Sequence, residues 1–334
     1  MSAWLLNLTI GELAGRHPSL AEFMAQSGDP GPANRRMADW LAGLTEEQMV
    51  HLAMDREQIL AHLDALADRV ASLRAASGVT IRDLTILAGR DKDGRAEAFD
   101  IPLAAGDVVC IVGPTGSGKS RLLADIECLA QGDTPSGRRV LVNGAAPQSG
   151  WRFASDRKLI AQLSQNMNFV VDLSVAEFIA MHADCRMVED RDQMVEDVIA
   201  CANDLAGERF KPEVSLTQLS GGQTRALMIA DTALLSASPV VLIDEIENAG
   251  IDRRKALDLL VAKEKIVLVS THDPILALMG SRRLVIRNGG VVDVIATSAP
   301  EQANRCVLER LDRSLMDIRH RLRNGQRIDG LLEF

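Results

Sequence analysis

The chain has 334 residues, of which 47% are hydrophobic, 25% are charged and 3% are aromatic, with no tyrosine. These proportions are typical of a globular protein and exclude a disordered or fibrous chain. The formal net charge is −9, and direct binding of nucleic acid is disfavoured because such binding usually requires a basic surface. The length suggests two or three domains, or one mid-sized domain with a smaller one attached.

The spacing of the cysteines and the lengths of the hydrophobic stretches indicate the cellular compartment in which the protein works. The five cysteines form no Cys-x-x-Cys pair, so the sequence predicts neither a zinc site nor a disulfide framework. No stretch approaches the roughly 18 apolar residues of a membrane-spanning helix. We therefore expect a cytoplasmic protein with no membrane span of its own.

Residues 1–77 are predicted to form a small all-helical module. The main signal is a Ser or Thr followed three residues later by Glu or Gln, because this pair satisfies free amides at a helix start. Three such pairs occur here: Thr9 with Glu12, Ser19 with Glu22, and Thr45 with Gln48.

A longer helix is predicted at the end of this module. Its apolar residues recur at alternating spacings of four and three and form one narrow stripe: Ile59, Leu63, Leu66, Val70 and Leu73. We expect this stripe to pack within its own module. The alternative is a coiled-coil seam, but the repeat is shorter than the three or four heptads that such a seam normally needs.

From Gly78 onward, short β-branched runs alternate with helical patterns, which predicts an α/β domain over residues 78–298. The expected strands are Val79–Leu87, Asp107–Val112, Arg139–Asn143, Val240–Ile243 and Ile266–Ser270, followed by a hairpin of Leu284–Arg287 and Val291–Ile295 turned at Asn288-Gly289-Gly290. Residues 299–334 are predicted to form a C-terminal helix, over 300–323, and a tail.

A glycine-rich loop follows the apolar strand that ends at Val112. Its sequence is Gly113-Pro114-Thr115-Gly116-Ser117-Gly118-Lys119-Ser120, and a helical stretch comes next. Glycines allow backbone amides to curl around phosphates, and the helix N-terminus adds a positive end. We expect Lys119 to reach the β- and γ-phosphates and the Ser120 hydroxyl to ligate Mg²⁺.

A second strand ends in two carboxylates. The apolar run Val240–Ile243 is followed by Asp244 and Glu245. Parallel strands present functional residues at their carboxyl ends. Downstream of a phosphate loop, we expect Asp244 to hold Mg²⁺ and Glu245 to polarise the attacking water.

The run Leu219-Ser220-Gly221-Gly222-Gln223 precedes a helical segment. By itself it could be a capped helix start, with Ser220 satisfying the first amides. Together with the phosphate loop and the strand ending in Asp244, it resembles the ABC ATPase family, of which this pentapeptide is the defining motif. The resemblance covers about two thirds of the chain, from Val79 to Val294.

The resemblance implies three further site residues and a fold. Gln165 matches the family's Q-loop glutamine, which senses the metal and the attacking water, and Gln162 is the alternative if the register differs. His272 matches the switch histidine at the γ-phosphate, and Asp252 matches the D-loop aspartate. The implied fold is a mixed sheet with flanking helices and a helical signature subdomain at about 166–238.

The resemblance also implies ATP and Mg²⁺ as ligands and a head-to-tail homodimer. In the family, Ser220, Gly221, Gly222 and Gln223 of one subunit would cover the γ-phosphate held by the loop of the other. Transport-type members usually stack adenine on an aromatic ring upstream of the loop. This sequence has none between Val79 and Arg95, so Arg90 or Phe99 would take that place.

Two interpretations of the coupled process remain open. In the first, the dimer is a soluble mechanoenzyme that remodels a protein client, and Leu8–Gly28 resembles a small helical module found beside metallocofactor proteins, which suggests a metalloenzyme client. In the second, the chain is the ATPase subunit of a membrane transporter whose permease docks near Gln165–Glu177. Only about a hundred residues separate Lys119 from Leu219, which leaves no room for the coiled-coil insertion of chromosome-maintenance ATPases.

Overall fold

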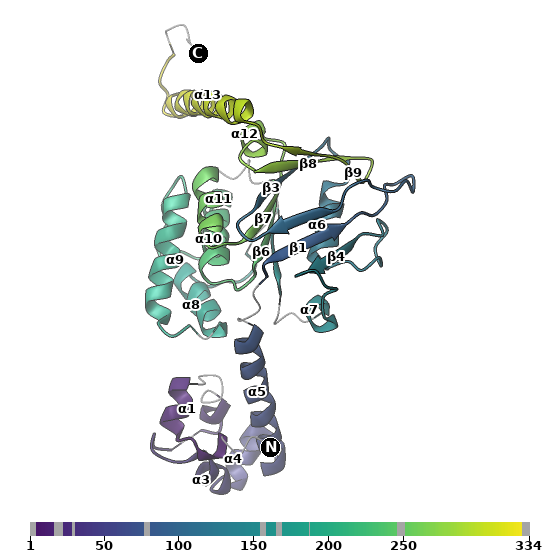
Figure 1. Cartoon of the computed structure of the whole chain (residues 1–334). Coiled ribbons are helices and arrows are strands. Elements are labelled where there is room, and N and C mark those ends of the chain that lie inside the picture. The colour runs from purple at the N-terminus through teal and green to yellow at the C-terminus, as the bar shows by residue number, and fades with distance from the viewer. Residues whose placement is uncertain are drawn as a thin grey trace. The chain divides into compact units, whose positions relative to one another are not determined.

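The computed structural model describes residues 5–16, 23–28, 31–76, 81–153, 158–164, 169–186, 188–245 and 251–328. The chain divides into two compact units. One comprises Met1–Val79 and the short segment Asp184–Glu189, and the other comprises Thr80–Ala183 and Asp190–Phe334. Figure 1 shows helices in the first unit and a mixture of strands and helices in the second.

The first unit is built from short helices and one long helix. Its described elements are the 3-10 turn η1 (Leu5–Asn7) and the helices α1 (Ile10–Arg16), α3 (Met37–Ala42), α4 (Glu46–Leu52) and α5 (Arg56–Ala76). Capping boxes start α1 and α4: the Glu12 carboxylate accepts from the Thr9 amide at 2.9 Å, and Thr45 and Gln48 cap each other. Two predicted helix starts are therefore confirmed, and the third, Ser19 with Glu22, lies outside the described residues.

The apolar stripe of α5 packs within its own unit. Ile59 and Leu63 are almost fully buried, and they share a core with Leu13, Met37 and Trp40. The expectation that this stripe serves the unit's own core is therefore confirmed for these two residues. The side chains of Val70 and Leu73 lie outside the described residues.

The second unit contains two sheets. A three-stranded antiparallel sheet has the order β2-β1-β4, and a six-stranded sheet has the order β5-β6-β7-β3-β8-β9. In the large sheet every neighbouring pair is parallel except β8 with β9. The strands are β1 (Asp83–Leu87), β2 (Ile101–Ala104), β3 (Val108–Val112), β4 (Arg139–Val142), β5 (Ile160–Leu163), β6 (Val240–Asp244), β7 (Ile266–Ser270), β8 (Arg282–Arg287) and β9 (Gly290–Ala296).

The middle strands of the large sheet are buried along their length. Every residue of β7 is buried, and so are the first four residues of β6. Strands covered on both faces consist of continuous β-branched and aliphatic residues, because neither face meets water. This explains why the apolar runs in the sequence predict these strands so closely.

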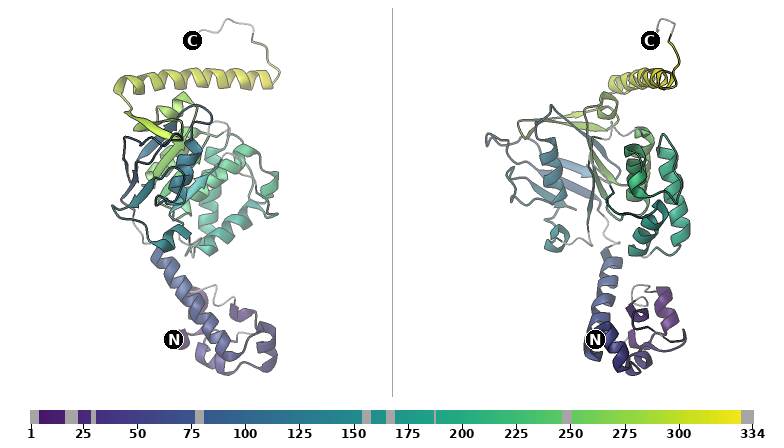
Figure 2. Two further views of the ribbon diagram at one scale, coloured as in Figure 1. Left: turned by 90° about the vertical axis from the view of Figure 1, so that its right-hand side faces the viewer. Right: turned by 180° about the vertical axis from the view of Figure 1, so that it is seen from behind.

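Helices cover both sides of the large sheet. The helix α6 (Lys119–Glu127) lies between the two sheets and contacts β4, β5 and β6. The helices α10 (Gly221–Leu234) and α11 (Arg253–Ala262) cover the other side of the large sheet (Figures 1 and 2). The helix α9 (Arg191–Leu205) packs against α10. The remaining described helices are α7 (Ser149–Phe153), α8 (Val175–Cys185), η3 (Leu216–Gln218), α12 (Pro274–Ala277) and α13 (Ala299–Arg323).

Two strands were not predicted, and one begins later than expected. The strands β2 and β5 both lie at sheet edges. Pro102 stands in β2 and Gln162 stands in β5, so neither has the continuous apolar pattern of a central strand. The strand that was predicted over Val79–Leu87 begins only at Asp83. The turn of the hairpin consists of Asn288 and Gly289, because Gly290 already belongs to β9.

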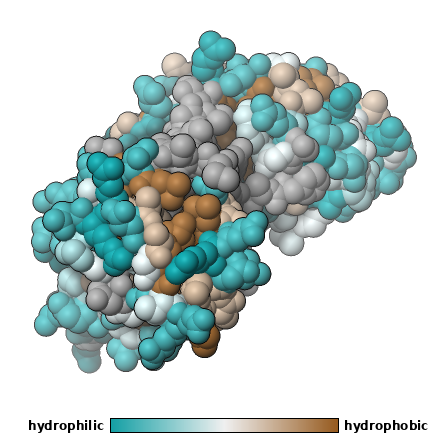
Figure 3. Space-filling view, turned by 90° about the horizontal axis from the view of Figure 1, so that it is seen from below, coloured by the Kyte–Doolittle hydropathy of each residue, from teal (hydrophilic) through white to brown (hydrophobic). Residues whose placement is uncertain are grey.

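The surface is mostly polar where it can be seen. The face seen from below is largely hydrophilic, with hydrophobic residues gathered in a few places (Figure 3). Among the described residues, no helix combines the length and the apolar character that crossing a membrane requires.

Candidate functional site

The register of three parallel strands brings the predicted site residues to one edge of the large sheet. Ile111 of β3 pairs with Ser270 of β7, and Ser270 pairs with Asp244 of β6. These three residues therefore form one row across neighbouring strands. The phosphate loop (residues 113–120), Glu245 and His272 all follow within two residues of that row, so they meet at the carboxyl edge.

The shape of the phosphate loop depends on the backbone conformation of three glycines. Gly113, Gly116 and Gly118 have φ angles of 156°, 77° and 110°, which side chains other than glycine rarely tolerate. A Cβ on Gly113 would lie 2.4 Å from the Ile286 carbonyl oxygen. The helix α6 begins at Lys119, so its free amides and its positive end face the loop. The cradle therefore fits a polyphosphate.

The turn between β8 and β9 supports this loop from behind. The Gly289 amide donates to the Ser117 carbonyl at 2.6 Å, and a Cβ on Gly118 would lie 2.7 Å from the Gly289 Cα. On the exposed side, the Lys92 ammonium donates to the Gly116 carbonyl at 3.0 Å. The loop is thus fixed by contacts with two segments that are remote in the sequence.

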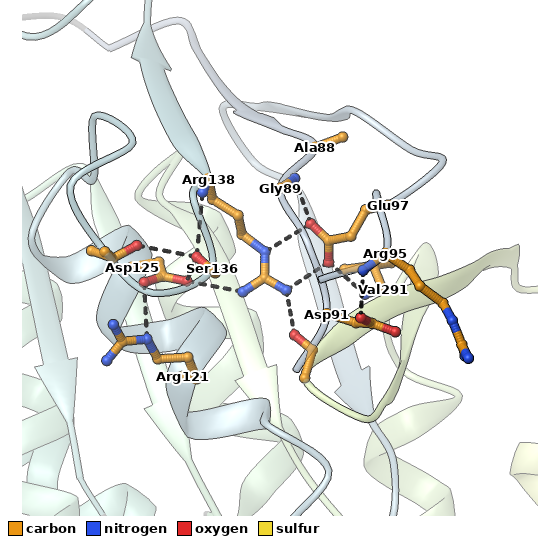
Figure 4. A network of polar contacts seen from close by, with 12 residues as sticks. Ala88, Gly89, Asp91, Arg95, Glu97, Arg121, Asp125, Ser136, Arg138 and Val291 are labelled. Atoms are coloured by element: carbon orange, nitrogen blue, oxygen red, sulfur yellow. Dashed lines mark hydrogen bonds and ion pairs between the residues drawn. The ribbon is translucent and has the colours of Figure 1, made fainter. Parts of the chain in front are cut away.

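A buried arginine joins this support to the small sheet (Figure 4). Arg138 donates to both carboxylate oxygens of Glu97 at 2.6 and 3.0 Å, and to Asp125 of α6 at 2.9 Å. It also donates to the Gly289 carbonyl at 2.7 Å. One guanidinium therefore connects the helix after the phosphate loop, the turn behind the loop and the residues after β1.

This network changes the proton affinity of Glu97. Burial by itself would raise the pKa of this carboxyl, but hydrogen bonds from Arg138 and from the Val291 and Gly89 amides outweigh burial and lower the pKa below its ordinary value. Glu97 therefore stays ionised beside Arg138. Removal of Arg138 would leave the buried Glu97 carboxylate without its cation, so we expect such a substitution to lower the stability of the fold.

Lys119 and His272 are in direct contact. The Lys119 ammonium donates to the Gly113 carbonyl at 2.9 Å and lies 2.9 Å from His272 Nε2. An ammonium has only donors, so His272 Nε2 acts as the acceptor in this arrangement. Glu245 Oε1 lies farther from the same nitrogen, at 3.7 Å. The structure therefore brings these three predicted residues together at one point.

Glu245 has an unusual backbone conformation. Its φ angle is +52°, a left-handed value that strains residues other than glycine. Its amide donates to the Ser270 carbonyl at 2.9 Å, and its carbonyl accepts from Arg225 of α10 at 3.1 Å. Such strain persists only where surrounding contacts fix it, and it is frequent at functional sites.

Other predicted residues cap helices in the single chain. Ser220 and Gln223 form a capping box at the start of α10, and the Asp252 side chain accepts from the Lys255 amide at the start of α11. Within the described residues, no hydrogen bond of Ser220 or Gln223 reaches the phosphate loop. The structure therefore does not bring these residues to the loop of their own chain.

The two candidate glutamines differ. Gln165 lies outside the described residues. Gln162 lies in β5, and its amide, in the orientation that satisfies its neighbours, donates to the Glu127 carboxylate at the end of α6. Gln162 is therefore engaged with a residue at the far end of α6 from the phosphate loop.

Ser120 and Asp244 supply oxygen atoms that suit Mg²⁺. Ser120 is the second residue of α6, and Asp244 is the last residue of β6. Among the described residues there is no group of three or more His, Cys, Asp or Glu that could hold a metal. Magnesium needs no such group, because one or two protein oxygens, phosphates and waters usually complete its shell.

Sequence patterns did not reveal the supporting residues Arg138, Arg225 and Lys92. Each is a charged residue whose hydrogen-bond partners on other segments lie at least 13 positions away along the chain. No local spacing encodes such contacts. The buried position of Arg138 would be the available signal, but burial is known only once the fold is known.

The mixed sheet with flanking helices and the phosphate loop at residues 113–120 define the chain as a P-loop ATPase. The family model for ABC transporters matches residues 97–248. An uncharacterised ABC transporter ATP-binding protein of Methanocaldococcus jannaschii is 51% identical over 249 residues, which cover 74% of this chain and 95% of that protein. The chain belongs to the family of ABC transporter ATP-binding proteins.

More distant relatives include larger proteins. A macrolide export ATP-binding/permease protein of Chromobacterium violaceum is 30% identical over 227 residues, which cover 65% of this chain and 34% of that protein. A thiamine import ATP-binding protein of a Chelativorans strain is 29% identical, over 62% of this chain and 83% of that protein. The chain thus spans about a third of the length of the macrolide export protein and most of the length of the thiamine import ATP-binding protein.

Solved structures share the fold. A subunit of an ABC transporter complex from Clostridium perfringens superposes with a TM-score of 0.52 at 22% identity, over 71% of this chain and all of that one. A dimeric ATP-binding cassette with bound ADP and Pi gives a TM-score of 0.50 at 22% identity, over 65% of this chain and 99% of that one. The predicted α/β fold of an ABC nucleotide-binding domain is therefore confirmed.

Proposed function

We propose that this chain is the ATP-hydrolysing subunit of a membrane transporter and that it drives a separate membrane-spanning partner from the cytoplasmic face. The observation that carries this proposal is an exposed apolar patch beside α8, made of Phe169, Val170, Val171 and Met181. The relatives described above support it, because their names are those of an ABC transporter ATP-binding protein, an export ATP-binding/permease protein and an import ATP-binding protein. None of those names supports the alternative of a metalloenzyme client.

The patch is apolar, exposed and held in place. Val170 is 93% exposed, Val171 is 45% exposed and Met181 is 47% exposed. Phe169 packs edge-on against Phe178, with ring centroids 5.1 Å apart, and Met181 lies one helical turn after Phe178. Because apolar groups gathered at a surface mark protein contacts, this patch suits an apolar partner helix.

The helix α8, which carries Met181 of the patch, also contacts α10, the helix that begins at Gly221. His182 Nδ1, one residue after Met181, lies 2.6 Å from Asp231 Oδ1 of α10. Arg225 of the same helix donates to the Glu245 carbonyl. A partner that pushes on α8 would therefore act on the helix that contacts Glu245, which is the kind of link that transport requires.

In this proposal, positioning and charge lower the barrier to phosphoryl transfer. The phosphate-loop amides and Lys119 hold the triphosphate. Glu245 orients the attacking water, and His272, which lies next to both charged side chains, contacts the γ-phosphate. Gln165 and Asp252 complete the site in the roles that the family resemblance implies.

The magnesium ion would be held by Ser120 and Asp244, with Gln165 nearby, and it would neutralise charge on the phosphates. The signature residues Ser220, Gly221, Gly222 and Gln223 would close over the nucleotide held by a second copy. A solved ATP-binding cassette of the same fold, with bound ADP and Pi, is dimeric, which supports a head-to-tail homodimer for this chain.

We also propose three functional parts: residues 1–77 as a separate helical module, 78–298 as the ATPase domain with its helical subdomain at about 166–238, and 299–334 as an appended helix and tail. The division into two compact units supports a separate N-terminal module. The helices α8, α9 and α10 support the helical subdomain.

A charge placed in the patch tests the transporter function. We expect Val170→Asp and Met181→Glu to lower membrane recovery of the chain from its native host about tenfold, because an unpaired charge opposes burial at an interface. Recovery is measured by quantitative immunoblotting of washed membranes. The partner retained by the unaltered chain should contain several membrane spans.

Val292→Asp is the matched control, because Val292 is as exposed as Met181, at 47%, but lies in β9, outside the patch. We expect it to leave membrane recovery and ATP hydrolysis unchanged. Equal membrane recovery for all three variants would contradict the docking role of the patch. Recovery of the chain only in complexes that lack any membrane protein would contradict the transporter function itself.

A further inference from the structure

Three consecutive cations begin α11: Arg253, Arg254 and Lys255. Positive charges at a helix N-terminus are unfavourable because they face the positive end of the helix dipole. Asp252 caps this terminus with its carboxylate, as helix starts prefer, but the next three residues oppose it. Helix stability alone therefore does not account for these three cations.

Each cation contacts a different acidic residue. The Lys255 ammonium lies 2.8 Å from Asp204 of α9, whereas Arg254 lies 3.7 Å from Asp258 of its own helix and 3.8 Å from Glu309 of α13. The side chains of Lys255 and Arg254 are about half-exposed or more, so water screens these contacts and they contribute little to stability. Arg253 differs, because its side chain is only 19% exposed.

Arg253 contacts two carboxylates at once. One guanidinium nitrogen donates to Asp273 Oδ2, and the other donates to Asp312 Oδ2 of α13 at 2.7 Å. Asp273 follows His272 directly in the sequence. A planar guanidinium binds carboxylates in fixed directions, so this contact restricts where Asp273 can lie relative to α13.

The other contacts of Asp273 complete its restraint. Its second carboxylate oxygen accepts from the Ile275 and Leu276 amides at 2.8 and 3.0 Å, which caps α12. Its amide donates to the Thr271 hydroxyl at 2.9 Å. Asp273 is therefore held on both sides, and the adjacent His272 remains 2.9 Å from Lys119.

From this geometry we propose that Arg253 is a positioning residue for His272 and that α13, through Asp312, shares in this positioning. The C-terminal helix then governs the hydrolysis step and leaves nucleotide binding unaffected. This inference rests on the proposed role of His272. It adds to that role a structural element, α13, which lies outside the strands and loops that form the site.

The proposal differs from a purely structural role for the Arg253 contacts. A structural contact would change the unfolding temperature and the amount of folded protein. A positioning contact changes kcat, leaves KM for ATP unchanged, and depends on the presence of His272. These readouts separate the two roles.

The test uses the full chain with Asp312→Asn, which removes one carboxylate charge from Arg253 while keeping the side-chain volume. We expect kcat for ATP hydrolysis to fall about threefold to tenfold, with KM within about twofold of the unaltered chain. Asp317→Asn is the matched control, because Asp317 is an exposed aspartate of the same helix. It should leave kcat and KM unchanged.

Two further variants make the result specific. Arg253→Gln should lower kcat at least as much as Asp312→Asn, again without a comparable change in KM. In a His272→Ala background, measured by single turnover, Asp312→Asn should have no additional effect, because its influence passes through His272. The unfolding temperature of every variant is measured beside its rate.

The outcomes are distinguishable. If His272→Ala is slow but Asp312→Asn and Arg253→Gln turn over like the unaltered chain, the positioning role is wrong and the proposed function stands. If Asp312→Asn slows the His272→Ala variant by the same factor as the unaltered chain, α13 acts independently of His272 and the proposal is overturned. If His272→Ala itself hydrolyses ATP at the unaltered rate, the assigned role of His272 fails and this inference fails with it.

Discussion

The two halves of the site are built in different ways. The half that we propose to hold the phosphates, residues 113–120, is one continuous loop whose shape comes from glycines and whose support comes from the buried network of Arg138. The half that we propose to act on the attacking water consists of Glu245 and His272, which follow the ends of two strands. Arg225 and Arg253 hold this second half from outside the large sheet.

This difference suggests how binding and hydrolysis can be controlled separately. The buried Arg138 pairs are inaccessible to water and fix the loop in one arrangement. The contacts of Arg253 are partly exposed, and those of Arg225 come from a helix next to the proposed docking patch. Nucleotide binding should therefore be insensitive to distant changes, and hydrolysis should respond to them.

The largest effect is expected in the hydrolysis half. Glu245→Gln should lower turnover about a hundredfold to ten-thousandfold, because the neutral amide cannot polarise water as a carboxylate does. ATP affinity, measured by calorimetry, should stay the same, and a nucleotide-bound dimer should accumulate. Glu264→Gln is the control, since Glu264 also has a left-handed φ, of 54°, but lies after α11. A Glu245→Gln protein with ordinary turnover would remove Glu245 from the mechanism.

A change in the support of the binding half should reduce stability. Arg138→Met leaves Glu97 buried without its cation and leaves Asp125 with only the partly exposed Arg121, at a cost of about 3–5 kcal/mol in the free energy of unfolding. Denaturant titration measures this loss. Arg139→Met, at the neighbouring exposed position, should change stability by less than about 0.5 kcal/mol. Similar stabilities for the two variants would show that the network does not fix the loop.

A substitution in the phosphate loop itself should weaken the binding of ATP. Lys119→Ala removes the cation beside the phosphates and should weaken ATP binding by about 2 kcal/mol or more, which is roughly thirtyfold. Calorimetry with non-hydrolysable ATP measures the change, and the exposed Lys211→Ala serves as the control. Unchanged affinity in the Lys119→Ala variant would contradict the assignment of the phosphate loop.

The smallest effect concerns pH. Because the pKa of Glu97 is lowered in the folded chain, its pairing with Arg138 stabilises the fold above pH 4.5, and this stability is lost as the pH falls through the folded-state pKa. The unfolding temperature should therefore fall more steeply with acid in the unaltered chain than in Arg138→Met, by a few degrees. Parallel curves for the two proteins would indicate that Glu97 does not contribute to this dependence.

Local patterns predicted much of this protein. The central strands, the capping boxes and the phosphate loop follow from apolar runs, side-chain spacing and glycines, which act over a few residues. The edge strands β2 and β5 escaped prediction because Pro102 and Gln162 break the apolar pattern there. The Arg138 network escaped prediction because Arg138 and its partners lie up to 151 positions apart in the sequence.

The sequence by itself determined that a triphosphate loop, an Asp-Glu strand end and a capped glycine pair occur in one chain, since each is a local pattern with a local physical cause. Only the tertiary structure decided that Lys119, Glu245 and His272 meet, because this depends on β3, β7 and β6 being neighbours in the sheet. Strand order arises from packing the whole unit, and no short segment encodes it. The same reason explains why the contact between α13 and Arg253 became visible only in the folded chain.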